Sequence, residues 1–328
     1  MSKARRRGGL GEFALIALLE RELGRKTSRA VEQGIGDDAA VLRLGRERLV
    51  VTVDDQVEGV HFDLRWLSLS DVGYRSLQAA TSDLAAMAAE PLAALASLHV
   101  PADFPAASLR QLARGQARAA AELSCPIVGG NVTRGPVLSI STSVLGRAVA
   151  RPLLRSGARP GDELWLLGEL GLARAGLLLH QQRARMPGRL RAVAAQAKQA
   201  WSRPRALVAA GRSLRGRARA AIDVSDGLSG DVGHLARASS VKAVLESRLI
   251  SRLMSPELAE LADLLGEPAV ALALRGGEDY ALVAAGPRAR RPARAKVIGR
   301  IERGHGAELE LETGQRFALG PGFDHLRR

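Results

Sequence analysis

Acidic residues recur in this chain in loops and at the ends of predicted strands, several of them beside glycine. Six of them could act together: Asp38, Asp54, Asp83, Asp223, Asp226 and Glu278. Proteins typically hold Mg²⁺ through one or two carboxylates per ion together with substrate phosphates. Carboxylates brought together from distant segments can therefore build a site for a nucleoside triphosphate and several metal ions. Phosphoryl transfer there depends mainly on positioning and charge neutralisation, so no catalytic nucleophile is expected.

Each acid also has a plainer interpretation, because the chain is rich in arginine and a single carboxylate usually pairs with a cation or caps a helix. Asp226 precedes a predicted helix and could be its N-cap. Asp83 could cap a short helix within residues 71–89. For any one acid alone this interpretation is the better one, but the group of six favours a shared site.

The segment 34–42 combines two glycines, two adjacent carboxylates and an apolar run that begins a predicted strand. Side chains alternate along an extended segment, so Asp37 and Asp38 should point in opposite directions. Only one of them can then face a shared site. We expect that residue to be Asp38, with Asp37 turned toward the surrounding structure.

The composition narrows the class of protein. The 328 residues carry a formal net charge of +14, which would attract polyanions, but only 3% are aromatic and the basic residues are spread along the chain. Specific nucleic-acid binding is therefore not expected. The single cysteine, Cys125, excludes an intramolecular disulfide and fits a reducing cytoplasm. No apolar stretch approaches the roughly 20 residues of a membrane span. We expect a cytoplasmic protein with no membrane partner.

Predicted strands and helices alternate in both halves of the chain, which indicates an α/β (α+β) protein of two domains. A turn-rich connector at 146–160 separates them, giving domains 1–148 and 149–328. Residues 181–219 read as an arginine-rich helical region with a solvated basic face, broken at two prolines. Residues 297–301 and 308–311 predict a closing hairpin. The remaining predicted helices are 11–23, 71–89, 104–123 and 228–238, and the remaining strands include 49–55, 92–100, 138–144, 164–167 and 221–224.

The common phosphate-binding signatures are absent from the sequence. No Gly-x-x-x-x-Gly-Lys-Ser/Thr loop occurs, and the six histidines have no metal-ligand spacing. Residues 34–39 formally fit a dinucleotide fingerprint, but acids at the variable positions would repel a pyrophosphate.

Seven segments together resemble the thiamine-monophosphate kinases, a family in the superfamily of aminoimidazole ribonucleotide synthetase. They occur in the family's order and cover nearly the whole chain: 11–13, 34–40, 57–62, 82–87, 155–162, 222–228 and 276–280. The order and the number of matches make this resemblance more specific than any single motif.

The resemblance implies two α/β domains with mixed sheets, the first binding ATP and metal and forming the dimer, the second completing the active site. It also implies ATP-dependent conversion of thiamine monophosphate to thiamine diphosphate by direct in-line transfer, with several Mg²⁺ ions and a homodimer. By position, the implied metal ligands are Asp38, Thr52, Asp54, Asp83, Asp223 and Asp226. The implied ATP-binding residues are Gly130, Asn131, Arg155, Ser225 and, more weakly, Arg114. Those implied to face thiamine monophosphate are His61 and Glu278.

The sequence departs from the family pattern at three places. Asn131 replaces a metal-binding Asp, so a neutral amide stands where a charge is expected. Val53 replaces a Thr, and the family's Trp beside the thiamine ring aligns near Gly320, where Phe317 or Phe323 could substitute. Two alternatives therefore remain: a catalytically weakened paralogue that binds nucleotide or thiamine phosphate, and an ATP-dependent enzyme resembling aminoimidazole ribonucleotide synthetase. A basic nucleic-acid-binding protein is a third interpretation and rests on charge alone.

Overall fold

The computed structural model describes residues 12–23, 28–182, 186–320 and 322. Within them, the first half of the chain builds a six-stranded mixed sheet of order β1-β2-β3-β6-β4-β5. Its neighbouring strands are antiparallel except β4 and β5, which are parallel and joined through a helix. The strands are β1 (Val31–Gln33), β2 (Ala40–Leu44), β3 (Glu47–Val57), β4 (Glu90–Val100), β5 (Ile127–Arg134) and β6 (Ser139–Arg147).

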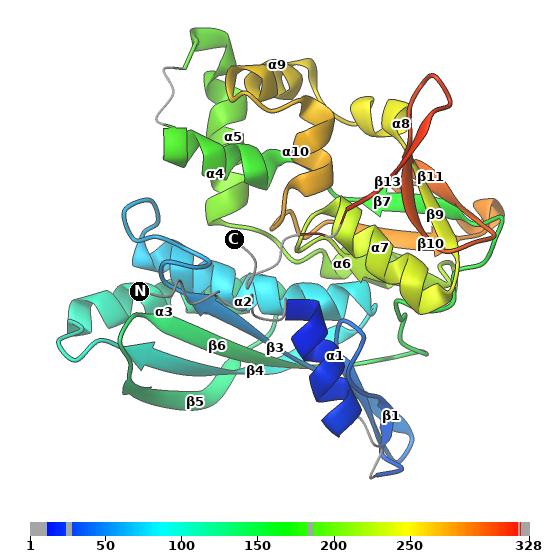
Figure 1. Cartoon of the computed structure of the whole chain (residues 1–328). Helices are drawn as coiled ribbons and strands as arrows, with labels where there is room; N and C mark the ends of the chain where they lie inside the picture. Colours follow the sequence, from blue (N-terminus) through cyan, green and yellow to red (C-terminus); the bar gives the residue numbers. More distant parts are fainter. Residues whose placement is uncertain (1–11, 24–27, 183–185, 321, 323–328) are drawn as a thin grey trace, which may run out of the picture.

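Helices α2 (Leu69–Ala86) and α3 (Ala106–Leu123) cover one face of this sheet, whereas its other face is open in Figure 1. Ser68 starts α2 with a capping box that includes Asp71. Gly115 allows the two helices to approach closely, since a Cβ atom at this position would lie 1.9 Å from the Ser70 carbonyl oxygen. The remaining helix of this half, α1 (Glu12–Leu23), lies beside β1 in the figure.

The second half builds a seven-stranded mixed sheet of order β13-β12-β9-β11-β7-β10-β8 from the described residues. All neighbours are antiparallel except β9 and β12. Its strands are β7 (Glu163–Leu167), β8 (Ala220–Asp223), β9 (Lys242–Glu246), β10 (Leu282–Gly286), β11 (Lys296–Glu302), β12 (Gly306–Glu310) and β13 (Arg316–Ala318). Its helices are α4 (Leu172–Gln182), α5 (Arg191–Ser202), α6 (Val208–Ser213), α7 (Leu228–Ser239), α8 (Ser247–Ser251), α9 (Pro256–Leu264) and α10 (Ala269–Arg275), with 3₁₀ turns at Gly188–Leu190 and Arg288–Arg290.

Helix α2 connects the two halves, because it packs on the first sheet and on the second at once. Ala85 and Ala86 belong to the same buried cluster as Trp165 on β7. A Cβ atom on Gly211 of α6 would lie 2.0 Å from the Ala85 carbonyl oxygen, so the backbones of α2 and α6 nearly touch. A helix between two layers must be apolar or paired on nearly every side, and most of α2 is buried.

The structure confirms the α/β architecture with two mixed sheets and corrects two local predictions. The predicted closing hairpin of 297–301 and 308–311 is wrong, because β11 and β12 pair with opposite edges of β9 rather than with each other. β12 instead forms its hairpin with β13. Apolar alternation identifies a strand but does not specify its partner. The prediction for 181–219 described only a solvated basic face. It left out the buried side of α5, which includes Val193, Ala197 and Trp201.

The predicted absence of a membrane span can be examined on the helices. None of those within the described ranges is long and apolar enough to cross a membrane.

Candidate active site

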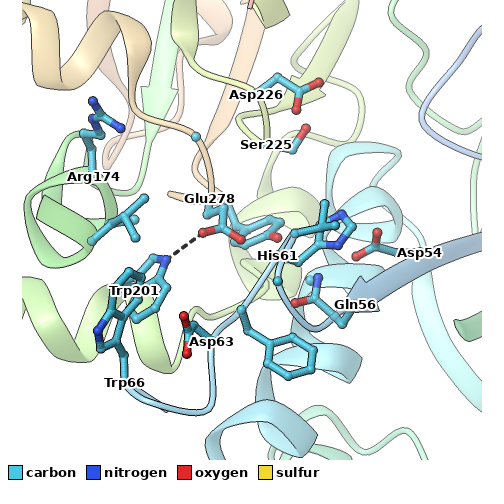
Figure 2. Close-up of a pocket in the computed structure, with 18 of the residues that line it drawn as sticks. Asp54, Gln56, His61, Asp63, Trp66, Arg174, Trp201, Ser225, Asp226 and Glu278 are labelled. Carbon is cyan, nitrogen blue, oxygen red and sulfur yellow. Dashed lines mark hydrogen bonds between the residues drawn. The ribbon is translucent and has the colours of Figure 1, made fainter. Parts of the chain in front are cut away.

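A cavity of about 670 Å³ lies where the two halves of the chain meet (Figure 2). The first half contributes the end of β3, the loop after it and α2, and the second contributes β8, α4, α5 and the loop 276–280. The cavity is lined by seven of the residues predicted to form the site: Asp54, His61, Asp83, Asp223, Ser225, Asp226 and Glu278. The fold therefore brings together acids from both halves of the chain, from Asp54 to Glu278, as a shared site requires.

Three carboxylates form a cluster on one side of this cavity. Asp54 comes from β3, Asp83 from α2 and Asp223 from the end of β8. Burial raises the pKa of Asp54 to about 7. Burial, followed by the charges of Asp223 and Asp38, raises the pKa of Asp83 well above its ordinary value. This arrangement disfavours three bare negative charges and favours a bound cation or protons.

Hydroxyl groups orient two members of the cluster. Thr52, two residues before Asp54 and on the same face of β3, donates a hydrogen bond to Asp83. Ser82 Oγ donates to Asp223 Oδ2 over 2.6 Å. Asp83 belongs to α2 itself, so it does not cap a separate short helix. Each hydroxyl thus holds one oxygen of its carboxylate.

Asp38 lies behind the cluster rather than on the cavity wall. Arg155 donates to Asp38 Oδ1 through Nε at 2.8 Å and Nη2 at 2.6 Å. Among the described residues, Asp38 Oδ2 is buried without a hydrogen-bond partner. Burial raises the pKa of Asp38 to about 8 although Arg155 opposes the shift. Oδ2 is therefore a buried acceptor that a cation could satisfy.

Asp37 lies in a bend at 37–39 rather than in the predicted extended segment, and its carboxylate still contacts different groups from that of Asp38. Its carboxylate accepts the backbone N–H of Asp38 at 3.0 Å and the backbone N–H of Arg155 at 3.1 Å. Both partners are backbone groups, so Asp37 ties segment 34–42 to the connector before β7. This contact sets the position of Arg155 relative to Asp38.

The residues present fit Mg²⁺ in their chemistry. Within the described ranges, no group of three or more His, Cys, Asp or Glu residues could hold a metal ion by itself. Mg²⁺ does not need such a cage, because it keeps several waters and takes one or two carboxylates plus substrate phosphates. The donors here are all oxygens, with raised carboxyl pKa values and one orphan oxygen on Asp38. This is the donor set that a hard cation prefers.

The loop 276–280 sets the opposite side of the cavity. A Cβ atom on Gly277 would lie 2.6 Å from the Ser225 carbonyl oxygen, so only glycine fits this close approach. Glu278 adopts a left-handed φ of 65° and donates its N–H to the Ser225 carbonyl over 2.8 Å. Asp279 accepts the N–H groups of Gly171 and Ala173 at the start of α4. These contacts aim the Glu278 side chain into the cavity.

His61 and Asp226 also line the cavity. His61 Nδ1 accepts the Val57 N–H over 3.1 Å, so a neutral imidazole carries its proton on Nε2. The N-cap of α7 is Gly227 rather than Asp226, so the helix-cap interpretation of Asp226 is wrong. The Asp226 N–H instead donates to Asp231, a buried acid in the first turn of α7.

Four predicted nucleotide-binding residues do not line this cavity within one copy of the chain. Arg155 lies behind the cluster with Asp38. Gly130 and Asn131 lie on the edge strand β5, and Arg114 lies on the exposed side of α3. The register puts Asn131 in a row with Ser97, whereas Gly130 falls in the row that includes Asp54. Because adjacent residues on a strand face opposite sides, Asn131 faces the open side of the sheet, away from Asp54.

Of the two residues predicted to substitute for the family's Trp, only Phe317 is described, and it does not line the cavity. Phe317 lies on β13 and is 48% exposed. Phe323 lies outside the described residues. Gly320 borders a separate hollow of about 370 Å³ with His234 and Arg237.

Sequence reasoning missed three residues that support or line the cavity. Arg75 and Gln56 are fully or almost fully buried, and Trp201 is 2% exposed at the end of α5. Arg75 lies in a segment that was predicted as an ordinary helix. Trp201 lies in a segment that was predicted to have a solvated basic face. Arg75 gave no usable signal, because the helix carries other polar residues such as Gln78 and Asp83, and the burial of Arg75 is not visible in the sequence.

Family models match most of the chain. The model described as "AIR synthase related protein, N-terminal domain" matches residues 36–148, and the corresponding C-terminal model matches residues 159–312.

Curated relatives named thiamine-monophosphate kinase are similar over nearly their whole length. The protein from Aquifex aeolicus is 35% identical over 92% of this chain and 94% of its own. The protein from Mycobacterium tuberculosis strain H37Rv is 36% identical over 89% and 85%.

Solved structures agree with this similarity. One described as "AaThiL complexed with AMPPCP and TMP" has a TM-score of 0.87 at 32% identity and covers 99% of this chain and 100% of its own. The thiamine-monophosphate kinase of Stenotrophomonas maltophilia has a TM-score of 0.73 at 35% identity, covering 92% and 97%.

Proposed function

The chain belongs to the AIR synthase related family, among the thiamine-monophosphate kinases, and on that premise we propose that it transfers the γ-phosphoryl group of ATP to thiamine monophosphate. The products are thiamine diphosphate and ADP. The observation that carries this proposal is the meeting of Asp54 and Asp83 from one half with Asp223 and Asp226 from the other in one cavity. A site for two phosphorylated substrates needs this concentration of metal-binding oxygen atoms.

The transfer is a direct displacement at phosphorus. A phosphate oxygen of thiamine monophosphate forms a bond to the γ-phosphorus while the bond from that phosphorus to the bridging oxygen of ADP breaks. The attacking oxygen is already ionised near neutral pH, so the step needs neither a general base nor a protein nucleophile. The protein binds both substrates in line and offsets their negative charge.

We propose that bound Mg²⁺ supplies most of the charge neutralisation on the phosphates. The residues that would hold it are Asp38, Thr52, Asp54, Asp83, Asp223 and Asp226. The raised pKa values of the clustered acids and the unpartnered Asp38 oxygen support this assignment. A cation would let these carboxylates ionise together.

For ATP, we propose contacts from Arg155 and Ser225 beside the acids, and from Gly130, Asn131 and Arg114 at the outer edge of the first sheet. Arg155 suits phosphate because its planar guanidinium offers several fixed donors. In the ligand-free arrangement it pairs with Asp38. That pair uses Nε and Nη2, so Arg155 would contact phosphate oxygens through Nη1.

For thiamine monophosphate, we propose His61 and Glu278 as binding residues, because both line the cavity. Figure 2 shows both side chains among those that line the cavity, where a small molecule could contact both.

We propose that the protein is a homodimer formed through the open face of the six-stranded sheet. Val53 and Leu95 share a row on that face and expose 63% and 42% of their surface. A second copy would remove this apolar surface from water and would also cover Asn131. Light scattering in solution should give twice the chain mass of 34.7 kDa, and a monomer would contradict the proposal.

Two further features belong to the same proposal. We place the domain boundary at 148/149, in the connector between β6 and β7 that has no helix or strand. We propose that the protein acts in the cytoplasm. The free, buried thiol of Cys125 fits that reducing compartment.

Purified protein incubated with ATP, Mg²⁺ and thiamine monophosphate tests the activity. Chromatography should show thiamine diphosphate and ADP in equal amounts. A parallel reaction without thiamine monophosphate controls for ATP hydrolysis. If both substrates bind and no thiamine diphosphate forms, the chain is a binding paralogue and the proposed function is wrong.

A further inference from the structure

The carboxylate of Glu278 is held by two residues from distant parts of the chain. Trp201 donates its indole N–H, through Nε1, to Glu278 Oε2 over 2.8 Å, the contact drawn as a dashed line in Figure 2. Arg75 Nη2 donates to Glu278 Oε1. Each carboxylate oxygen therefore has one protein donor, and the glutamate cannot rotate without losing both.

Arg75 is itself fixed on every side. Its side chain is fully buried, Nε donates to Gln56 Oε1 over 2.9 Å, and Nη1 donates to the Trp201 carbonyl oxygen over 2.9 Å. Its guanidinium also lies 5.6 Å from the centroid of the Trp201 ring. Trp201 thus supports Glu278 directly through its indole and indirectly by holding Arg75.

The indole is held in place by its aromatic neighbours. Trp66 meets Trp201 edge-on at 6.1 Å between ring centroids, and His180 lies 5.2 Å away. Trp66 and Trp201 both line the cavity. With the ring packed in this way, the direction of its N–H is set by the fold rather than by the ligand.

An ionised carboxylate has several acceptor positions, of which the protein uses one on each oxygen. The side chain of Glu278 is 24% exposed, so the remaining positions are open to the cavity. A carboxylate fixed in this way suits a ligand that offers an N–H donor beside positive charge. Thiamine monophosphate has both, in its aminopyrimidine and its thiazolium ring.

We propose that Trp201 and Arg75 are positioning residues that fix Glu278 for recognition of the amino-substituted ring of the acceptor substrate. The inference rests on the proposed function for the identity of that substrate. It predicts that the N–H of Trp201 contributes to binding of thiamine monophosphate and not to binding of ATP or to the transfer step.

Trp201→Phe tests this inference, because phenylalanine keeps an aromatic ring and removes the donor. The KM for thiamine monophosphate should rise roughly tenfold, the size expected for one hydrogen bond to a charged group. The kcat and the KM for ATP should stay within about twofold, because those steps use the opposite end of the cavity. Calorimetry with thiamine monophosphate alone should show the same loss of affinity.

Trp165→Phe is the matched control. Trp165 is also fully buried and donates its Nε1–H to a glutamate, Glu163, over 2.9 Å, but it does not line the cavity. The two variants should lose comparable thermal stability, and only Trp201→Phe should change the KM for thiamine monophosphate. An unchanged KM in Trp201→Phe, or an equal rise in both variants, would overturn the inference.

The same experiment separates this inference from the proposed function. If the wild-type chain forms no thiamine diphosphate, the proposed function fails, and the calorimetric comparison of wild type and Trp201→Phe still decides the role of Trp201. If wild-type protein does not bind thiamine monophosphate either, both proposals fall.

Discussion

The two sides of the cavity balance negative charge in opposite ways. At the cluster side, Asp54, Asp83 and Asp223 face one another, and burial together with mutual repulsion raises the pKa values of Asp83 and Asp54. At the other side, Glu278 has its own donors in Arg75 and Trp201. The cluster side needs a cation to balance its negative charges, whereas the protein itself supplies the donors for Glu278. The contrast indicates that one side is built for metal and phosphate and the other for an organic ring.

The largest expected effect comes from removing one carboxylate of the cluster. Asp54→Asn should lower the rate of thiamine diphosphate formation by a factor on the order of 10³, because a neutral amide cannot offset phosphate charge through a metal. The fold should survive, since the folded protein already disfavours the charged form of Asp54, whose pKa is raised to about 7. Product chromatography and thermal unfolding measure the two effects.

Asp55→Asn is the control for that variant, because Asp55 is the next residue on β3 and its exposed side chain faces the opposite side of the sheet. It should keep near-normal turnover. Wild-type turnover in Asp54→Asn would refute the metal assignment of that residue.

A moderate effect is expected at the Glu278 side from Arg75→Lys. Lysine keeps the charge but cannot reach three acceptors at once, so Glu278 loses part of its fixed orientation. The KM for thiamine monophosphate should rise roughly fivefold with little change in kcat, and the melting temperature should fall by several degrees. Steady-state kinetics and calorimetry check this, and a change confined to kcat would contradict the division of labour between the two sides.

A smaller effect is expected on the stability of the metal-free protein as pH changes. The folded pKa values of Asp38 and Asp54 are raised to about 8 and about 7 from 3.8, so the folded protein keeps protons that the unfolded chain has lost. Stability should therefore fall as pH rises between about 4 and about 8. Scanning calorimetry should show a melting temperature a few degrees lower at about pH 8.5 than at about pH 6.

Mg²⁺ should reverse that trend, because a cation that binds the ionised carboxylates stabilises the folded state more at the higher pH. A melting temperature that rises with pH in the absence of metal would show that the cluster is not under electrostatic strain.

The smallest effect is expected outside both sides, at Asn131. Asn131→Asp should leave turnover unchanged or raise it by up to about threefold, because it restores the carboxylate that the family pattern has at this position. Initial-rate measurements at saturating substrates check this. A clear loss of activity would show that the amide has a role of its own.

Local chemistry made the cluster predictable from the sequence. Asp37 accepts the backbone N–H of Arg155 and Asp38 accepts hydrogen bonds from its guanidinium, but residues 37–39 form a bend, so the predicted alternation of an extended segment is not the reason. The two α/β halves follow from alternating strand and helix patterns, whereas the mixed sheets were implied by the family resemblance. The acids could be recognised as a group because they lie in loops or at the ends of predicted strands, several of them beside glycine.

The Glu278 side could not be predicted in the same way. Arg75 reaches Glu278 across 203 residues and the Trp201 carbonyl across 126, and nothing near Arg75 in the sequence specifies these partners. The pairing of β12 with β9 has the same origin, because the choice of neighbour depends on the whole sheet. Contacts of this kind are set by tertiary packing, which a local pattern does not encode.

The fate of a labelled γ-phosphate tests the central claim most directly. With ATP labelled at the γ-phosphorus, Mg²⁺ and thiamine monophosphate, the label should appear in the terminal phosphate of thiamine diphosphate, with no labelled protein, and chelation of the metal should stop the transfer. Label recovered as inorganic phosphate or bound to the protein, with thiamine monophosphate unchanged, would contradict direct transfer at this site.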